Sequence, residues 1–211
     1  MIWEVDTKSI VMLTKYSEKG RQCCEQYYPI DDETITSDDI SITVVDKTIY
    51  NDYTVSELKL LRGEEERRIK HFFYSCWPDF GIPKECKSLI EFIDIFREKM
   101  SYDTAPHVVH CRAGVGRSGA FIALDRSLQQ VKKLNKVNIF GIVSELRYNR
   151  VSMVQTEHQY ICIHECVLDV INKKLKTEQI KSLPYQLLED AEVPLDNDAD
   201  SVKPEYVNQT Y

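Results

Sequence analysis

The chain contains 211 residues with a formal net charge of −7, and 43% of its residues are apolar. This is enough apolar material for the core of one globular domain. The sequence has no apolar run of transmembrane length and no N-terminal basic region followed by a hydrophobic core, so it predicts neither a membrane span nor a signal peptide. Its seven cysteines follow neither disulfide nor zinc spacing, which favours a reducing compartment and predicts a cytoplasmic location.

The first half of the chain predicts mainly strands. We expect a short helix over residues 1–8, followed by strands over 9–14, within 23–29, and over 41–46, 50–62 and 67–75. The acidic stretch from Asp31 to Asp39 is typical of a solvated loop.

The second half predicts mainly helices, because apolar residues recur there at helical spacing. The expected helices cover residues 86–100, 117–134, 137–149 and 156–175, around a short buried strand at 106–110. Together these elements predict an α/β domain with a mixed sheet.

An acidic tail follows this domain. Residues 189–211 hold seven acidic residues against Lys203 alone, so nearly all of the net charge lies there. We expect a domain over residues 1–175 and a disordered tail over 176–211. Because phosphate repels such a tail, nucleic-acid binding is not predicted. Tyr206-Val207-Asn208 has the Tyr-x-Asn form that binds adaptor SH2 domains when phosphorylated, although three-residue matches often arise by chance.

The most informative stretch is a loop with a cysteine at one end and an arginine at the other. It follows the strand at 106–110 and reads His110-Cys111-Arg112-Ala113-Gly114-Val115-Gly116-Arg117-Ser118-Gly119. Its glycines let consecutive backbone N–H groups turn inward, and the helix behind it directs amides at an anion. The same amides favour a thiolate at Cys111, and Arg117 can grip two phosphate oxygens. The loop therefore predicts a phosphate site with a nucleophile.

A Cys-x5-Arg loop alone does not identify one kind of enzyme. A single cysteine is usually a small buried apolar residue, and a single arginine is usually a solvated charge. Sulfur-transfer enzymes, arsenate reductases and several classes of phosphatase use similar loops. Other segments of the chain must decide between these classes.

A second segment surrounds one carboxylate with aromatic residues, prolines and a glycine. It reads Trp77-Pro78-Asp79-Phe80-Gly81-Ile82-Pro83. We interpret it as a movable lid, in which Asp79 enters a partly apolar environment, keeps its proton and protonates a leaving phenolate. The alternative is an ordinary surface turn, since Pro-Asp and Gly-Ile-Pro are common turn sequences.

A third segment runs from Met153 to Tyr160. Thr156 and Gln159 have the spacing of a capping box before a helix. Gln155 and Gln159 are also neutral amides, which can orient an attacking water beside a phosphoenzyme without adding negative charge. Helix capping and water positioning can coexist here.

In this order, the three segments resemble the classical protein tyrosine phosphatase family of the non-receptor type, over roughly residues 1–173. The stretch Glu18-Lys19-Gly20, with Cys24, Tyr27 and Pro29, is similar to the family's E-x-G motif, and Arg147 and Arg150 fit its L-R-x-x-R helix. The resemblance implies a mixed, highly twisted central sheet flanked by helices. Arg112 and residues 139–143 also look like the tyrosine phosphatases of polydnaviruses, which implies substrates in the cytoplasm of an infected host cell.

The resemblance implies a two-step hydrolysis of phosphotyrosine in proteins by a monomer. Cys111 attacks phosphorus to form a cysteinyl-phosphate, while Asp79 protonates the leaving tyrosine and later takes a proton from the hydrolytic water. The phosphate oxygens are bound by Arg117 and by the loop amides. The residues that this assigns to the phosphate-binding loop are Arg112, Ala113, Gly114, Val115, Gly116 and Arg117. No metal or organic cofactor is required.

The remaining roles also follow from the resemblance. Ser118 stabilises the Cys111 thiolate, and His110 holds the loop and lowers the thiol pKa. Gln155, assisted by Gln159, positions the water. The residues expected to support this machinery are Glu18, which braces Arg117, and Trp77 and Pro78 beside the lid.

Several departures from the family pattern bear on activity. The sequence around Met1 matches a helix that lies well inside the family's domain, so we expect an N-terminally shortened chain with unpaired sheet edges and uncovered apolar surface. Arg112 stands where serine is usual, Cys23 where lysine is common, and Tyr28 where tryptophan is usual. The alternative to an active phosphatase is therefore a phosphotyrosine-binding pseudophosphatase or an inert remnant.

Overall fold

The computed structural model describes residues 1–30, 33–78, 81–83, 85–100 and 105–182. Its contacts divide the chain into two units, Met1–Val170 and Ile171–Tyr211. The first unit contains every strand of the described residues and the loop from Cys111 to Arg117. In the second, the described residues continue the last helix to Ser182. The acidic tail predicted from the sequence lies almost entirely outside the described residues.

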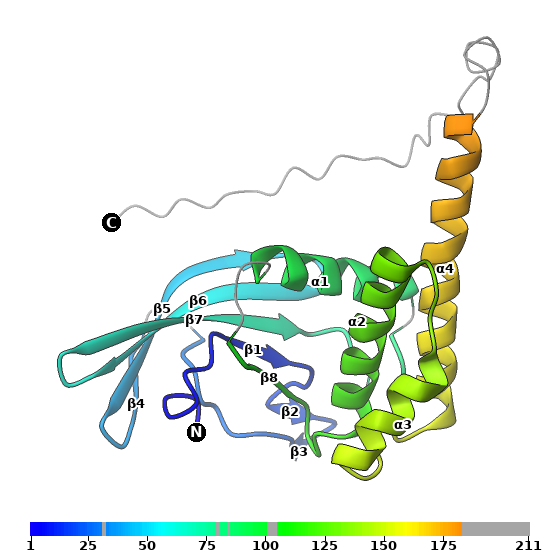
Figure 1. The fold of residues 1–211 in the computed structure, drawn as a ribbon. Coiled ribbons are helices and arrows are strands. Elements are labelled where there is room, and N and C mark those ends of the chain that lie inside the picture. The colour runs from blue at the N-terminus through cyan, green and yellow to red at the C-terminus, as the bar shows by residue number, and fades with distance from the viewer. Residues whose placement is uncertain (31–32, 79–80, 84, 101–104, 183–211) are drawn as a thin grey trace. The chain divides into compact units, whose positions relative to one another are not determined.

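The first unit is built on a six-stranded mixed sheet (Figure 1). Its strand order is β4-β5-β6-β7-β1-β8. These strands are β1 (Ser9–Met12), β4 (Ile35–Ser37), β5 (Ile40–Ile49), β6 (Tyr53–Arg62), β7 (Glu65–Tyr74) and β8 (His107–His110). Strands β4 to β7 form an antiparallel meander, whereas β1 runs parallel to both β7 and β8. The predicted mixed sheet is confirmed, and β1 brings the N-terminal segment beside the strand that precedes Cys111.

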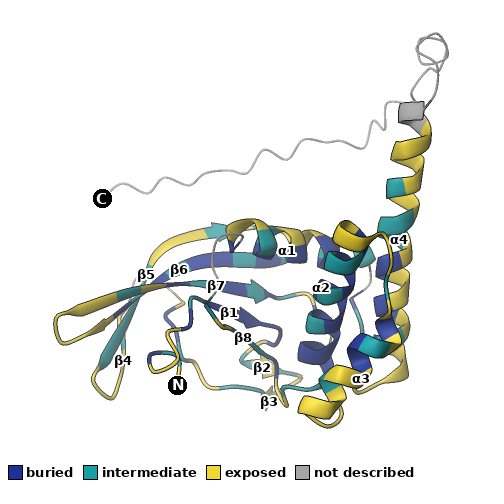
Figure 2. Cartoon of the chain, viewed as in Figure 1, coloured by how far each residue is buried: buried dark blue, intermediate teal, exposed yellow. Residues whose placement is uncertain are grey.

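Among the described residues, four helices follow the meander, as the sequence predicts. They are α1 (Cys86–Lys99), α2 (Gly116–Leu134), α3 (Ile139–Asn149) and α4 (Glu157–Ser182). The buried face of α2 is visible in Figure 2. Helix α4 continues to Ser182, beyond its predicted end at residue 175, where the helical spacing of apolar residues fades. No helix of the described residues is both long and apolar enough to cross a membrane.

The core beneath α1 and α2 is aromatic. Phe96 of α1 is only 2% exposed, and its ring centroid lies 5.2 Å from that of Phe72 on β7 and 5.7 Å from that of Phe121 on α2. It also meets the ring of His107 on β8 at 5.2 Å. One side chain thus joins α1 and α2 to two strands of the sheet.

The N-terminal residues do not form the predicted helix. The Val5 amide donates to the Met1 carbonyl at 3.0 Å, which makes one turn, and Asp6 then adopts a left-handed backbone with φ 50°. The Thr7 amide closes back onto the Ile2 carbonyl at 3.1 Å. A single turn gains too few hydrogen bonds to propagate as a helix, so the prediction over residues 1–8 is wrong.

Two further predictions in the first half need correction. No strand forms within 23–29; a small two-stranded sheet of β2 (Ser17–Glu18) and β3 (Arg21–Gln22) precedes it, and Tyr28 packs its side chain inward instead. Strand β4 lies inside the stretch predicted as a solvated loop. It pairs with β5 across a tight turn in which Asp38 has φ 52°, a conformation that Asp tolerates.

A cavity of about 760 Å³ lies against one part of the sheet. Most of its sheet lining is aliphatic and comes from β1, β5, β6, β7 and β8: Ile10, Ile40, Ile42, Leu58, Leu60, Ile69 and Val108. The N-terminal turn and residues 24–27 also line it, as does His110.

The aromatic core yields a stability prediction. Replacing Phe96 by Ala should lower the free energy of unfolding by about 3–5 kcal/mol, because the ring is buried against three elements. The matched control is Phe140→Ala on α3, where the ring is 73% exposed and the change should stay within about 0.5 kcal/mol. Urea denaturation followed by circular dichroism measures both. Equal losses in the two variants would contradict this packing.

Candidate active site

Cys111 lies at the junction of β8 and α2. Strand β8 ends at His110 and α2 begins at Gly116, so residues 111–115 form a short turn at a helix N-terminus. Gly114 has a left-handed backbone with φ 70°, and its amide donates to the Cys111 sulfur at 3.3 Å. Val115, the N-cap residue, provides no side-chain cap. The first amides of α2 are therefore not satisfied by a capping side chain, as an anion-binding helix N-terminus requires.

These amides change the acidity of the Cys111 thiol. Burial alone raises its pKa, but hydrogen bonds from the Ser118 side chain and from the backbone amides of Ser118, Gly114 and Val115 outweigh burial and bring the pKa below its ordinary value. The Ser118 hydroxyl is buried and has no hydrogen-bond partner among the described residues, so it is available to the Cys111 thiolate. The thiolate is thus stabilised by dipoles that would equally stabilise a bound phosphate.

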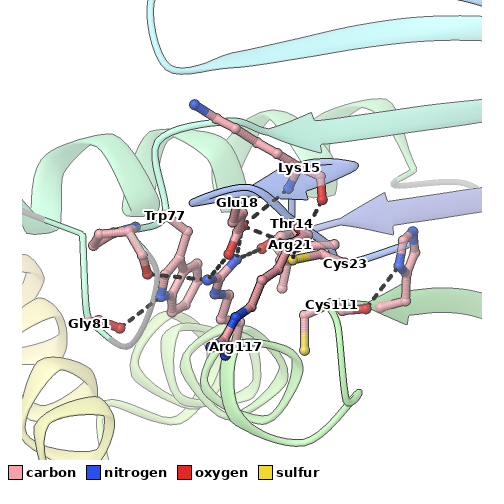
Figure 3. A network of polar contacts seen from close by, with 12 residues as sticks. Thr14, Lys15, Glu18, Arg21, Cys23, Trp77, Gly81, Cys111 and Arg117 are labelled. Carbon is pink, nitrogen blue, oxygen red and sulfur yellow. Dashed lines mark hydrogen bonds and ion pairs between the residues drawn. The ribbon is translucent and has the colours of Figure 1, made fainter. Parts of the chain in front are cut away.

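Arg117 is held by a two-pronged ion pair with Glu18 (Figure 3). Its Nη1 donates to Oε1 at 2.6 Å and its Nη2 to Oε2 at 2.7 Å, and both side chains are about 10% exposed or less. Glu18 also accepts from the Thr14 hydroxyl at 3.1 Å and the Lys15 amide at 3.3 Å. The predicted bracing of Arg117 by Glu18 is present.

The ion pair remains charged at neutral pH. The hydrogen bond from Arg117 lowers the pKa of Glu18, against the opposing effect of burial. A carboxylate whose pKa is lowered by folding stabilises the native state above its unfolded pKa, and this contribution is lost as the pH falls through the lowered value.

The segment expected to carry the general acid also contacts Arg117. Nη2 of Arg117 donates to the carbonyl of Pro78 at 3.3 Å, and Nε1 of Trp77 donates to the carbonyl of Gly81 at 3.0 Å (Figure 3). Trp77 is 4% exposed. Asp79 itself lies outside the described residues. Hydrogen bonds nevertheless join Trp77 to Gly81 across it and Pro78 to Arg117.

The two glutamines lie against the N-terminus of α2. A Cβ atom added to Gly116 would come within 3.0 Å of Gln159 Nε2 and 3.3 Å of Gln155 Oε1. Gln159 also completes the predicted capping box: its Oε1 accepts from the Thr156 amide at 3.3 Å, and its own amide donates to the Thr156 hydroxyl at 3.2 Å. Gln155 is exposed whereas Gln159 is 6% exposed. Capping and proximity to the loop therefore coexist, and Gln155 is the more accessible amide.

A model of the family described as protein-tyrosine phosphatase matches residues 1–169, which include the whole of this cluster. The chain belongs to this family. The family assignment and the mixed, curled sheet with its helices confirm the fold expected from the sequence.

Named relatives support the same assignment. The phosphatidylinositol phosphatase PTPRQ of Rattus norvegicus and Homo sapiens is 40% identical over 90% of this chain. The receptor-type tyrosine-protein phosphatase eta of Gallus gallus is 40% identical over 85%, and a tyrosine-protein phosphatase Lar-like of Caenorhabditis elegans is 41% identical over 82%. The chain covers only 8%, 13% and 8% of the lengths of these relatives, respectively.

Tyr27 belongs to the stretch that resembles the family's E-x-G motif, but the sequence does not predict its place in the site. Its hydroxyl oxygen lies 2.7 Å from Nε2 of His110 and 2.7 Å from Nε2 of His71. His71 was not predicted as a site residue at all. No local pattern could find it, because the three residues are brought together from β7, β8 and the segment after β3.

Arginines frame the loop in different ways. The side chain of Arg112 is exposed. Arg150 donates from Nη2 to the Ala113 carbonyl at 3.1 Å, which supports the outer side of the loop. Arg147 donates to the carbonyls of Met153 and Val154 at 2.9 and 2.8 Å and so holds the segment before Gln155.

The segment before Gln155 approaches α2 so closely at Gly119 that no side chain would fit there. A Cβ at Gly119 would lie 2.3 Å from the Val154 amide nitrogen, which donates to the Val115 carbonyl at 3.1 Å. Val154 itself has φ 59°, an unfavourable conformation for a β-branched residue. The position of Gln155 is thus set by a glycine on α2 and by a strained residue held from two sides.

The thiol environment predicts a measurable acidity. The rate of Cys111 alkylation by iodoacetamide, followed by mass spectrometry of its peptide, should rise with a midpoint below that of an unperturbed cysteine in a short peptide measured in parallel. Ser118→Ala should move this midpoint upward because the thiolate loses a hydrogen bond. The matched control is Ser127→Ala, a buried serine on the same helix whose hydroxyl donates to the Ala123 carbonyl. A midpoint that Ser118→Ala leaves unmoved would contradict the assignment.

The close approach at Gly119 gives another test. Gly119→Ala should destabilise the fold by about 1–3 kcal/mol through overpacking, and should displace the segment that carries Gln155. Thermal unfolding measures the first effect, and amide chemical shifts of residues 153–156 measure the second. An Ala variant with wild-type stability and unchanged shifts would show that the contact is not as tight as the structure has it.

Proposed function

We propose that this chain hydrolyses phosphotyrosine in proteins through a cysteinyl-phosphate intermediate. The observation that carries the proposal is one loop that offers a thiol of lowered pKa, a ring of backbone amides and a buried arginine fixed by Glu18. These groups suit a nucleophile that must attack a dianion, because the amides and Arg117 offset the negative charge of both partners. Family membership supports phosphotyrosine as the substrate.

In the first step, the Cys111 thiolate attacks phosphorus and the bond from phosphorus to the tyrosine oxygen breaks. Asp79 donates its proton to that oxygen, so that tyrosine leaves as a neutral phenol. The contact between Arg117 and the Pro78 carbonyl supports this role, because it joins the phosphate-binding side chain to the residue that precedes Asp79.

In the second step, a water attacks phosphorus and the bond from sulfur to phosphorus breaks. Asp79, now a carboxylate, takes a proton from the water, and phosphate leaves while the thiolate is restored. Gln155 orients the water with the help of Gln159, and the Ser118 hydroxyl stabilises the departing sulfur. The position of both amides against Gly116 supports these assignments.

The proposal also includes the place where the chain acts. A thiolate nucleophile needs reducing conditions, which favours the cytoplasm as the place of action. A monomer, a place among the non-receptor or polydnavirus phosphatases and an SH2 partner at Tyr206 stay predictions from the sequence. The same holds for a domain over residues 1–175 followed by a tail over 176–211.

The test is hydrolysis of a phosphotyrosyl peptide by the purified chain, beside Cys111→Ser and Asp79→Ala. Turnover should fall to background in Cys111→Ser and by about 10²–10⁴-fold in Asp79→Ala, the range for loss of a general acid. Cys76→Ser, at an exposed cysteine, should retain wild-type turnover.

Two further substrates sharpen the result. A phosphoseryl peptide should not be hydrolysed. A phosphoinositide is included because one relative is named a phosphatidylinositol phosphatase, and a strong preference for it would overturn the proposed substrate. A folded wild-type chain without turnover would exclude the enzyme, and binding of the phosphotyrosyl peptide by that chain would then identify the pseudophosphatase alternative.

A further inference from the structure

A chain of three polar side chains, one buried and two half-buried, leads from the sheet to the nucleophile. We call it the His-Tyr-His chain, and it consists of His71 on β7, Tyr27 and His110 on β8. The Tyr27 hydroxyl oxygen lies 2.7 Å from Nε2 of each histidine. The ring of Tyr27 meets both imidazoles edge-on, at centroid distances of 5.7 Å for His71 and 5.4 Å for His110.

The direction of the hydrogen bonds can be assigned from His110. Its Nδ1 lies 3.3 Å from the carbonyl oxygen of Cys111, which can only accept, so Nδ1 carries the proton. Burial lowers the pKa of His110, although the bond to the Cys111 carbonyl opposes this, and the ring is therefore neutral. A neutral ring protonated at Nδ1 has a bare Nε2. The Tyr27 hydroxyl must then donate to His110.

The same reasoning extends to His71. The hydroxyl of Tyr27 has one proton, and burial raises its pKa, so it stays protonated and uses that proton for His110. Its oxygen must accept from the other neighbour, so Nε2 of His71 carries a proton. His71 is 1% exposed, and burial lowers its pKa to about 3, so the ring is neutral. The hydrogen bond to Tyr27 then confines it to the tautomer with a proton on Nε2.

We propose that His71 is a positioning residue of the active site, whose Nε2–H directs the Tyr27 hydroxyl toward His110 and so holds His110 in the tautomer that supports the Cys111 carbonyl. Without a donor at His71, the Tyr27 proton can turn away from His110, whose Nε2 then lacks its partner. His110 is then able to take its proton at Nε2, which removes the donor to the Cys111 carbonyl. The effect on turnover rests on the proposed function, whereas the tautomers do not.

The direct test is nitrogen NMR of the full chain labelled with ¹⁵N-histidine, with signals assigned from single histidine variants. The expected result is a proton on Nδ1 of His110 and on Nε2 of His71. The reverse arrangement at either ring, or a charged His110 at neutral pH, would overturn the proposal. This measurement needs no turnover, so it stands even if the chain proves not to be a phosphatase.

Variants separate hydrogen bonding from packing. His71→Gln keeps an N–H donor in reach of Tyr27, whereas His71→Leu removes the donor and keeps an apolar side chain of comparable bulk. We expect His71→Leu to mix the tautomers of His110, raise the alkylation midpoint of Cys111 and lower kcat about tenfold, the factor that loss of one hydrogen bond of roughly 1.4 kcal/mol implies. His71→Gln should restore most of each change.

The matched control is His107→Gln, at a second histidine of β8 whose Nδ1 pairs with the Ser9 hydroxyl at 2.8 Å. It should leave the His110 tautomer and the Cys111 midpoint unchanged. A folded His71→Leu chain with a wild-type His110 tautomer, or a His71→Gln chain as impaired as His71→Leu, would overturn the proposal and leave His71 a packing residue.

Discussion

The pairing of Arg117 with Glu18 is the interaction on which the site depends. Two buried charges are costly to remove from water, and the cost is offset only where geometry and additional hydrogen bonds are good. Here both Nη atoms of Arg117 meet both oxygens of Glu18, and backbone carbonyls of Leu13 and Pro78 accept from the same guanidinium. One side chain from α2 thus joins the end of β1, the β2 strand and the segment that enters the Trp77 turn. Loss of either charge would leave its partner buried and unpaired, which affects the fold and the chemistry together.

The loop from Cys111 to Arg117 is in turn shaped by close backbone approaches. Gly114 turns its amide toward the Cys111 sulfur, and Gly119 admits the backbone of Val154 to within a distance that no side chain would allow. Arg147 and Arg150 then hold the neighbouring segments through backbone carbonyls. As a result, groups from α2, from the α3–α4 connection and from the start of α4 converge on one helix N-terminus. The dipoles gathered there stabilise a thiolate and an anionic ligand by the same means.

Much of the architecture followed from local patterns in the sequence. The helices α1, α2 and α3 begin and end within two residues of their predicted limits, because apolar side chains repeat at helical spacing and their ends are marked by proline, glycine or asparagine. Apart from the C-terminal end of α4, the mistakes lie in the first half. The turn at residues 1–6 and the strand β4 depend on single left-handed residues, Asp6 and Asp38, which propensity does not foresee. The segment 23–29 has a strand-like composition, but its tyrosines pack by their rings instead of pairing by their backbone.

The sequence by itself determined which groups of the candidate site share one loop, because Cys111, Arg117 and their glycines lie within a short stretch whose spacing is a local property of the chain. It also determined the capping box of Thr156 and Gln159, since a helix N-terminus is stabilised by residues three apart. The family resemblance predicts that Glu18 braces Arg117, but only the tertiary structure gives the two-pronged geometry of this pair and places Gln155 against Gly116. It alone joined His71, Tyr27 and His110, because hydrogen bonds between residues from different strands depend on sheet register, which no short stretch of sequence contains.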